Sequence, residues 1–263
     1  MSRAARLASI VSPAVLPVLV IAIWEIVARK GLVSTFLLPS FSGVVVRLAQ
    51  DIASGEILWS AAGTVMRLVV SYAIAAVLGV ALGVMMARVR MVRWLLDPLV
   101  SIGFPAPKIS FLPIFVLWFG VFDKPKIVIA IFACVFPIIA GTWAGTQAVD
   151  KYLVWSAEQL GTRPATMLWR IVLPAALPSV FTSLQVALPI AFIAVIVAEM
   201  LGGGGGLGGT MMEYTRLADP AGVFANLIAI GFLGFLAMKG LEWLRRRVLV
   251  WHEEVQRQGD VVS

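Results

Sequence analysis

The sequence predicts an all-α, polytopic membrane protein with six transmembrane helices. Of its 263 residues, 60% are hydrophobic and only 13% are charged, and the mean hydropathy is +0.97. Soluble domains average about 45–50% apolar and about 25% charged residues, so this chain has too few polar side chains to cover a surface in water. The apolar runs are continuous rather than alternating, which favours helices over a membrane β-barrel.

Each predicted span is a charge-poor stretch of about 20 residues, the length that crosses the hydrocarbon core. Within a single transmembrane domain over 1–263, the spans are expected at approximately 7–28, 60–87, 95–122, 126–149, 172–200 and 220–243. The first has the basic start of a signal peptide, at Arg3 and Arg6. Because Glu25 and further basic residues follow it without a small-residue cleavage site, we expect a retained helix.

The basic residues predict that both chain ends are cytoplasmic. With the N-terminus inside, thirteen Lys and Arg residues fall on inside segments and seven outside, with Lys108 in the membrane. Positive charge is enriched in cytoplasmic loops, so the net charge of +7 belongs with a membrane rather than with nucleic acid. The seven outside residues are Arg29, Lys30, Arg47, Arg67, Lys124, Lys126 and Arg216.

The first external connection, residues 31–59, contains one short amphipathic segment. Ser42 is expected to cap a helix in which Val44, Leu48 and Ile52 share a face. We expect this helix to lie on the outer leaflet.

Spans two and three each carry a feature that bears on helix packing or on the pathway. Gly79 and Gly83 in span two form a G-x-x-x-G pattern, which favours helix packing within the chain. Lys108 stands among prolines, including Pro105, in span three, and an ionisable residue at membrane depth usually faces protein or water. It is either a cavity-lining cation for an anionic substrate, or a structural partner of a carboxylate such as Glu199, or a snorkelling side chain.

Glu199 ends span five just before a glycine run. It faces the translocation path or pairs with a cation, and its boundary position favours a structural role at the external end. The run over 202–206 is not a phosphate loop, because no lysine follows it, and we expect a flexible hairpin. If ATP drives transport, a separate subunit must hydrolyse it.

The sequence offers few residues for disulfide, metal or catalytic chemistry. Cys134 is the one cysteine and lies in an apolar run, so no disulfide forms within the chain. His252 is the one histidine and lies near the C-terminus, which argues against a histidine metal site or a Ser-His-Asp triad in the core. We expect no catalytic residue, metal or cofactor in this chain, and a membrane enzyme ranks last among the candidate functions.

The segment over 150–174 is too polar to span a membrane and too apolar for a free loop. Gly161 is expected to end one short helix, and Thr162 to cap the next, with Pro164 in its first turn. Such a cytoplasmic knob either fits a groove on another protein or floats at the inner leaflet. The expected apolar faces are Leu153, Ala157 and Leu160 in the first helix, and Leu168, Ile171 and Val172 in the second.

This segment resembles the cytoplasmic signature of the inner-membrane permeases of binding-protein-dependent ABC importers. That signature reads E-A-A, three residues, G, nine residues, I-x-L-P. Trp155 and Ser156 stand where the signature has glutamate and the first alanine, and Glu158 lies one residue past the second alanine. The matching positions are Ala157, Gly161, Ile171, Leu173 and Pro174.

The resemblance covers nearly the whole chain and is closest to the nitrate/sulfonate/taurine branch of these permeases. That branch also serves phthalates and pyrimidine or riboflavin-type compounds, so it does not fix the substrate. The basic external residues, with Lys108, weakly favour an anion. The stretches that carry the resemblance are 38–40, 96–98, 107–120 and 198–208.

The resemblance implies a type I ABC importer permease in the bacterial inner membrane. Two copies would form the pathway, two cytoplasmic ATPase subunits would bind ATP and Mg, and an external binding protein would deliver the solute. The alternative is a self-sufficient secondary transporter or channel, for which we find no clear internal repeat. The pathway residues are expected to include Lys108, Pro105 and Glu199. The residues expected to couple to the ATPase are Ala157, Glu158, Gly161, Thr162, Arg163, Pro164, Leu168, Ile171, Leu173 and Pro174.

Overall fold

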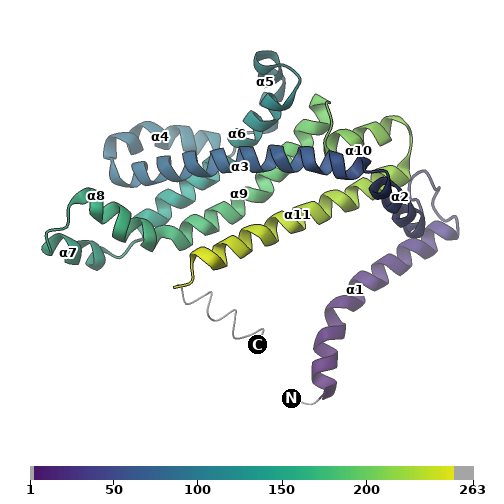
Figure 1. Ribbon diagram of the computed structural model, residues 1–263, viewed down its shortest axis with the longest axis horizontal. Helices are drawn as coiled ribbons and strands as arrows, with labels where there is room; N and C mark the ends of the chain where they lie inside the picture. Colours follow the sequence, from purple (N-terminus) through teal and green to yellow (C-terminus); the bar gives the residue numbers. More distant parts are fainter. Residues whose placement is uncertain (1–2, 252–263) are drawn as a thin grey trace.

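Four long apolar helices form the body of the computed structural model, which describes residues 3–251, with side chains from residue 15 onward. The described part is helical and contains no strand. Figure 1 shows the long helices running roughly along one axis, with α7 and α8 near one end and α2 near the other. The four are α3 (Glu56–Arg88), α6 (Asp123–Gln147), α9 (Leu173–Gly202) and α11 (Pro220–Val248).

Glycines hold α3 against α6. A Cβ added at Gly79 would lie 2.6 Å from Ile138, and one at Gly83 would lie 2.6 Å from Thr142. Only glycine, which has no side chain, allows the two helices to come this close. Such close packing holds helices together in lipid, where the hydrophobic effect between them is weak. The prediction that this glycine pair packs within the chain is confirmed.

A second glycine pair, on α6 itself, holds α6 against α9. A Cβ at Gly141 would lie 2.3 Å from Ser183, and one at Gly145 would lie 2.3 Å from Ser179. The helix α6 is therefore the centre of a three-helix layer, with a small-residue seam toward each neighbour.

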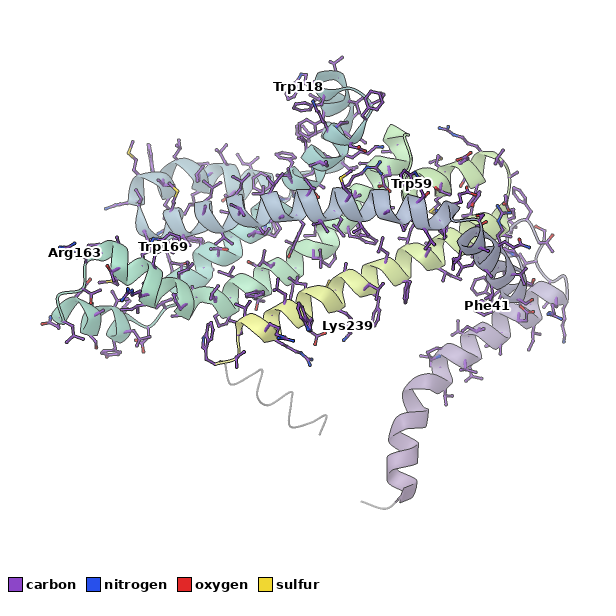
Figure 2. All side chains as sticks on the ribbon, in the orientation of Figure 1. Phe41, Trp59, Trp118, Arg163, Trp169 and Lys239 are labelled. Carbon is purple, nitrogen blue, oxygen red and sulfur yellow. The ribbon has the colours of Figure 1, made fainter. Side chains whose placement is uncertain are left out.

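The single helix expected over 95–122 is corrected to a broken pair. The helix α4 (Arg90–Gly103) is followed by a 3₁₀ turn, η1 (Lys108–Phe111), and by α5 (Leu112–Phe119), and the two parts are bent by 97°. Pro105 and Pro107 fall in the gap, and neither has the backbone N–H that a continuing helix needs. In Figures 1 and 2, α5 projects sideways from the bundle with Trp118 on it.

The first predicted span corresponds to α1 (Arg3–Arg29), which leads away from the bundle in Figure 1. Side chains before residue 15 lie outside the described part. In the described part, four helices, or five with the bent pair, are long and apolar enough to span a membrane, so the count of six stays a prediction. Trp24 anchors the end of α1, because its indole N–H donates to the Pro39 carbonyl at 2.8 Å.

The helix α2 (Phe41–Ala53) begins two residues earlier than expected. Its cap is Ser40, whose hydroxyl accepts the Gly43 N–H at 3.2 Å, and not Ser42. Ser42 instead binds Glu25 of α1, through its N–H at 3.0 Å and its hydroxyl at 2.7 Å. The prediction of a Ser42 cap is therefore wrong, because this side chain is taken up by a neighbouring helix.

Ion pairs dock α2 onto the bundle, and its expected position on the outer leaflet stays a prediction. Arg47 pairs with Asp51 at 2.9 Å and with Asp219, just before α11, also at 2.9 Å. The hydroxyl of Tyr214, on α10 (Leu207–Arg216), donates to Asp51 at 3.1 Å. Burial raises the pKa of Tyr214 to about 12.

Candidate functional site

The loop over 150–174, expected on the cytoplasmic side, is built around Gly161. The first of its helices, α7 (Lys151–Gln159), ends where Gly161 adopts a φ of +70°. The N–H of Thr162 donates to the Ala157 carbonyl at 3.0 Å, and the N–H of Gly161 to the Glu158 carbonyl at 2.9 Å. These are the two bonds of a Schellman motif, so the prediction that Gly161 ends this helix is confirmed.

The second helix of the loop begins differently from the expectation. Arg163, in extended backbone, is the cap of α8 (Pro164–Met167), and no side chain completes the cap. The predicted Thr162 cap is wrong, because Thr162 lies one residue before the cap and its N–H closes α7 instead. Pro164 occupies the first turn, as predicted.

The loop joins the membrane helix without a break. A π-helical turn, η2 (Leu168–Val172), connects α8 to α9, and the Leu173 N–H donates to the Leu168 carbonyl. Such π turns are frequent at functional sites. Pro174 follows at the start of α9, where its missing N–H is tolerated.

The loop has an apolar core of its own. Ala157, Met167 and Val172 are buried in it, which confirms Ala157 and Val172 as inward-facing. Leu153 and Leu160, expected on the same face as Ala157, are exposed instead, with Leu160 86% accessible. The side chains that complete the core are Val149, Val154, Leu168 and Ile171.

Exposed aromatic and aliphatic side chains cover the outside of this knob. Tyr152 and Trp155 stack edge to face with ring centroids 5.6 Å apart, and both are more than half exposed. Trp155 thus puts apolar surface where the signature has a carboxylate. Figure 2 shows Trp169 and Arg163 at this end of the molecule, far from Phe41 of α2. Exposed apolar surface of this kind occurs at protein–protein and at membrane interaction sites.

A cavity of about 780 Å³ lies between the knob and the end of α3. Arg88 closes it from the α3 side, and Glu158 and Arg163 are the charged residues that the loop contributes. The remaining lining residues are Gly161, Thr162, Pro164, Ala165, Met167 and Leu168. Eight of the ten predicted coupling residues are therefore brought together around this cavity or in the knob's core beside it: Glu158, Gly161, Thr162, Arg163, Pro164, Leu168, Ala157 and Ile171.

A groove of about 540 Å³ runs along α6 and α9. Lys108 sits at its rim, because its Nζ donates at 2.6 Å to the carbonyl of Phe104, a lining residue. Among residues 15–251 no carboxylate pairs with Lys108, and the pairing with Glu199 that was considered is wrong. Pro105 is exposed beside it. The groove is lined by small or hydroxyl residues, including Gly141, Ala144, Gly145, Ser179, Thr182 and Ser183.

Glu199 is fully buried at the other end of α9. Arg67 donates to its carboxylate at 2.6 Å, Thr64 at 2.9 Å, and the N–H of Gly208 at 3.0 Å. The geometry matches the structural role at the external end, and it sets Glu199 far along α9 from the groove rim at Lys108.

The glycine run is ordered, which corrects the expected flexible hairpin. Residues 203–206 all have positive φ, and Arg67 and Lys126 hold their carbonyls. These two cations, assigned from sequence to the outer surface, are buried. His252 lies outside the residues that the structure describes.

Four long apolar helices, with the knob at one end and the glycine loop at the other, have the architecture of an integral-membrane protein. Residues 79–250 match the family described as "Binding-protein-dependent transport system inner membrane component", and the chain belongs to this family. It is the permease subunit of a binding-protein-dependent ABC importer, and a self-sufficient secondary transporter or channel is not favoured.

Several relatives share this role by name. The taurine transport system permease protein TauC of Escherichia coli is 33% identical over 165 residues, which are 63% of this chain but only 60% of TauC. The Escherichia coli protein SsuC, provisionally named an aliphatic sulfonates transport permease, is 31% identical over 245 residues, or 92% of each chain. The formylaminopyrimidine transport permease protein ThiX of Halalkalibacterium halodurans is 29% identical over 92% of this chain and 96% of its own.

The fold is that of a type I ABC importer permease. A chain of the MetNI methionine ABC transporter, solved in inward-facing conformations, superposes with a TM-score of 0.65. The match covers 75% of this chain and 98% of that chain at 18% sequence identity. At this identity the likeness shows the fold alone.

Proposed function

We propose that two copies of this permease form a pathway that carries a small anion into the cell. Two cytoplasmic ATPase subunits dock against the loop over 150–174, and they hold the ATP and Mg that this chain does not bind. An external binding protein delivers the solute from the side of α2 and α10, and both chain ends face the cytoplasm. The best-supported substrate class is an organic sulfonate. The other candidate substrates are nitrate, an aromatic carboxylate and a vitamin precursor.

The observation that carries the ATPase proposal is the exposed apolar surface of a knob that is already folded. Ala157, Met167 and Val172 satisfy the loop's own core, so Trp155 and Leu160 are not needed to hold it together. An amphipathic helix that offers apolar side chains outward is suited to lie in a groove on a partner. The knob is on the side where the positive-inside bias places the cytoplasm.

Continuity between η2 and α9 supports the proposed coupling. The helical run extends from Pro164 to Gly202, so a push on the knob is passed directly to the helix that lines the groove. ATP-driven closure of the ATPase subunits would move the two knobs relative to each other and change which side of the membrane the groove faces.

Two features support an anionic substrate. Lys108 is a cation at the groove rim whose amine is bonded to a backbone carbonyl and not to a carboxylate. TauC and SsuC carry names that refer to taurine and aliphatic sulfonates, both of which have a sulfonate group. A cation without a carboxylate partner can attract that group without first breaking an ion pair.

Gentle solubilisation of native membranes, pull-down of the tagged chain and mass spectrometry test the assembly. The expected result is an ATPase subunit in equal amount together with a binding protein. A chain that purifies alone and moves solute in vesicles without ATP would contradict the proposal. For the substrate, uptake of labelled taurine should fall in Lys108→Gln and persist in Lys108→Arg, and equal uptake in both variants would remove Lys108 from the pathway.

A further inference from the structure

Three helices meet at a group of four charged residues, of which Arg67, Lys126 and Glu199 are buried and Asp123 is partly exposed. We call it the outer charge cluster: Arg67 of α3, Asp123 and Lys126 of α6, and Glu199 of α9. Arg67 pairs with Glu199 at 2.6 Å and with Asp123 at 2.7 Å. Glu199 and Lys126 have no accessible surface, and Arg67 is only 5% accessible. The two cations and two anions balance, so the cluster carries no formal net charge.

The glycine loop over 203–206 is wrapped around the two cations. Lys126 donates to the carbonyls of Gly203 and Gly204, and Arg67 donates to those of Gly204 and Gly205, both at 3.2 Å. Three successive carbonyls therefore turn inward. Only glycine takes up four consecutive positive φ angles without strain, which explains the composition of the loop.

The same cluster fixes the start of α10. Thr64 accepts the N–H of Leu207 at 2.9 Å and donates to Glu199, while Gly208 donates its N–H to Glu199 at 3.0 Å. A carboxylate at a helix N-terminus satisfies N–H groups that have no partner within the helix. One turn further along, the hydroxyls of Ser60 and Thr210 lie 2.8 Å apart and join α3 to α10.

We propose that Arg67, Lys126 and Glu199 are positioning residues that bind the outer ends of α3, α6 and α9, the glycine loop and α10 into one unit. This unit stays intact through the transport cycle. Separating its helices would leave a buried charge without its partner, which is strongly unfavourable, whereas moving the unit as a whole breaks none of these contacts. The outer side of the pathway therefore opens around this unit and not between α6 and α9.

Hydrogen exchange of the purified full chain separates a positioning role from a general structural one. Arg67→Met should speed amide exchange in the loop and α10, while the middle of α3 and α6 keeps its protection. Arg67→Lys should restore only part of it, because an ammonium cannot engage two carboxylates as the guanidinium fork does. The matched control is Arg216→Met, the same change at an exposed arginine at the end of α10. Uniformly faster exchange in all helices would contradict the proposal.

A reversible cross-link tests whether the unit stays intact. Ser60→Cys and Thr210→Cys are combined in a Cys134→Ala background, and the complex is oxidised in nucleotide-free, ATP-bound and vanadate-trapped states. We expect the disulfide to form equally in all three states, with no loss of ATP hydrolysis or of labelled taurine uptake. Failure to cross-link, cross-linking in one state only, or a loss of ATP hydrolysis that dithiothreitol reverses would each overturn the proposal. The cross-link in native membranes without nucleotide is read without an ATPase partner, whereas the comparison of nucleotide states rests on the proposed function.

Discussion

Replacing Gly161 with alanine tests whether the shape of the cytoplasmic loop, and not merely its presence, couples the permease to ATP hydrolysis. The residue sits at φ +70°, and an added Cβ would meet nothing within 4 Å. The substitution therefore creates no clash, and its cost is the conformational cost of the left-handed backbone. That cost is about 1–2 kcal/mol for an L-residue.

A cost of this size lowers the population of the correctly folded loop by about 5–30-fold relative to its alternatives. Gly161→Asn should lose less, because asparagine tolerates this backbone region better than alanine does. The matched control is Gly240→Ala on α11, where the added Cβ also meets nothing within 4 Å but φ is helical. There alanine should be neutral or stabilise the helix by about 0.5–1 kcal/mol.

The assay is ATP hydrolysis by the reconstituted complex, with and without loaded binding protein, at equal permease content judged by immunoblot. We expect stimulated hydrolysis to rank as wild type and Gly240→Ala first, Gly161→Asn next and Gly161→Ala last. Unchanged stimulation in Gly161→Ala would refute the coupling role. Equal losses in the alanine and asparagine variants would show that the backbone angle is not the cause.

Three further results are expected. Arg67→Met should lower the free energy of unfolding by about 3–5 kcal/mol, and the double variant with Glu199→Met should recover part of it, since the Glu199 carboxylate is then not left buried without Arg67; thermal unfolding in detergent measures both. Gly145→Val should abolish folded protein in size-exclusion chromatography, because even a Cβ there lies 2.3 Å from Ser179. The pKa of Tyr214 is about 12, above the usual 10.0. The neutral Tyr214 side chain therefore stabilises the fold fully below pH 10, and this stabilisation is lost as the pH rises through 12. Thermal melts across this pH range should show a fall in melting temperature that Tyr214→Phe removes.

The long helices were predictable because apolarity is a local property of the chain. The expected span over 220–243 lies within α11, and the one over 126–149 lies almost within α6. The break in the third span was missed because a charge-poor run says nothing about backbone hydrogen bonds. Pro105 and Pro107 were the available signal, since neither can donate an N–H to a helix.

The outer charge cluster was not predictable from hydropathy, because its members are remote in sequence. Arg67 and Glu199 are 132 residues apart, and Arg67 and Asp123 are 56 apart. Taken alone, each of these charged residues is typical of the end of a transmembrane span. The glycine loop was misjudged for a related reason: it has no side chains of its own, and the groups that order it come from α3 and α6.

The helical run from Pro164 to Gly202 joins the two ends of the molecule. Its 39 residues correspond to roughly 58 Å of helix, with the cytoplasmic knob at one end, Glu199 near the other and the groove between them. A buried ion pair fixes its outer end to α3, whereas the inner end is attached to a knob that keeps a core of its own. A force applied at the knob therefore meets a fixed outer end, and the helix has to carry its neighbours with it. For that reason Gly161, which shapes the knob, and the outer charge cluster, which holds the glycine loop, both act on the same helix, although neither touches the centre of the groove.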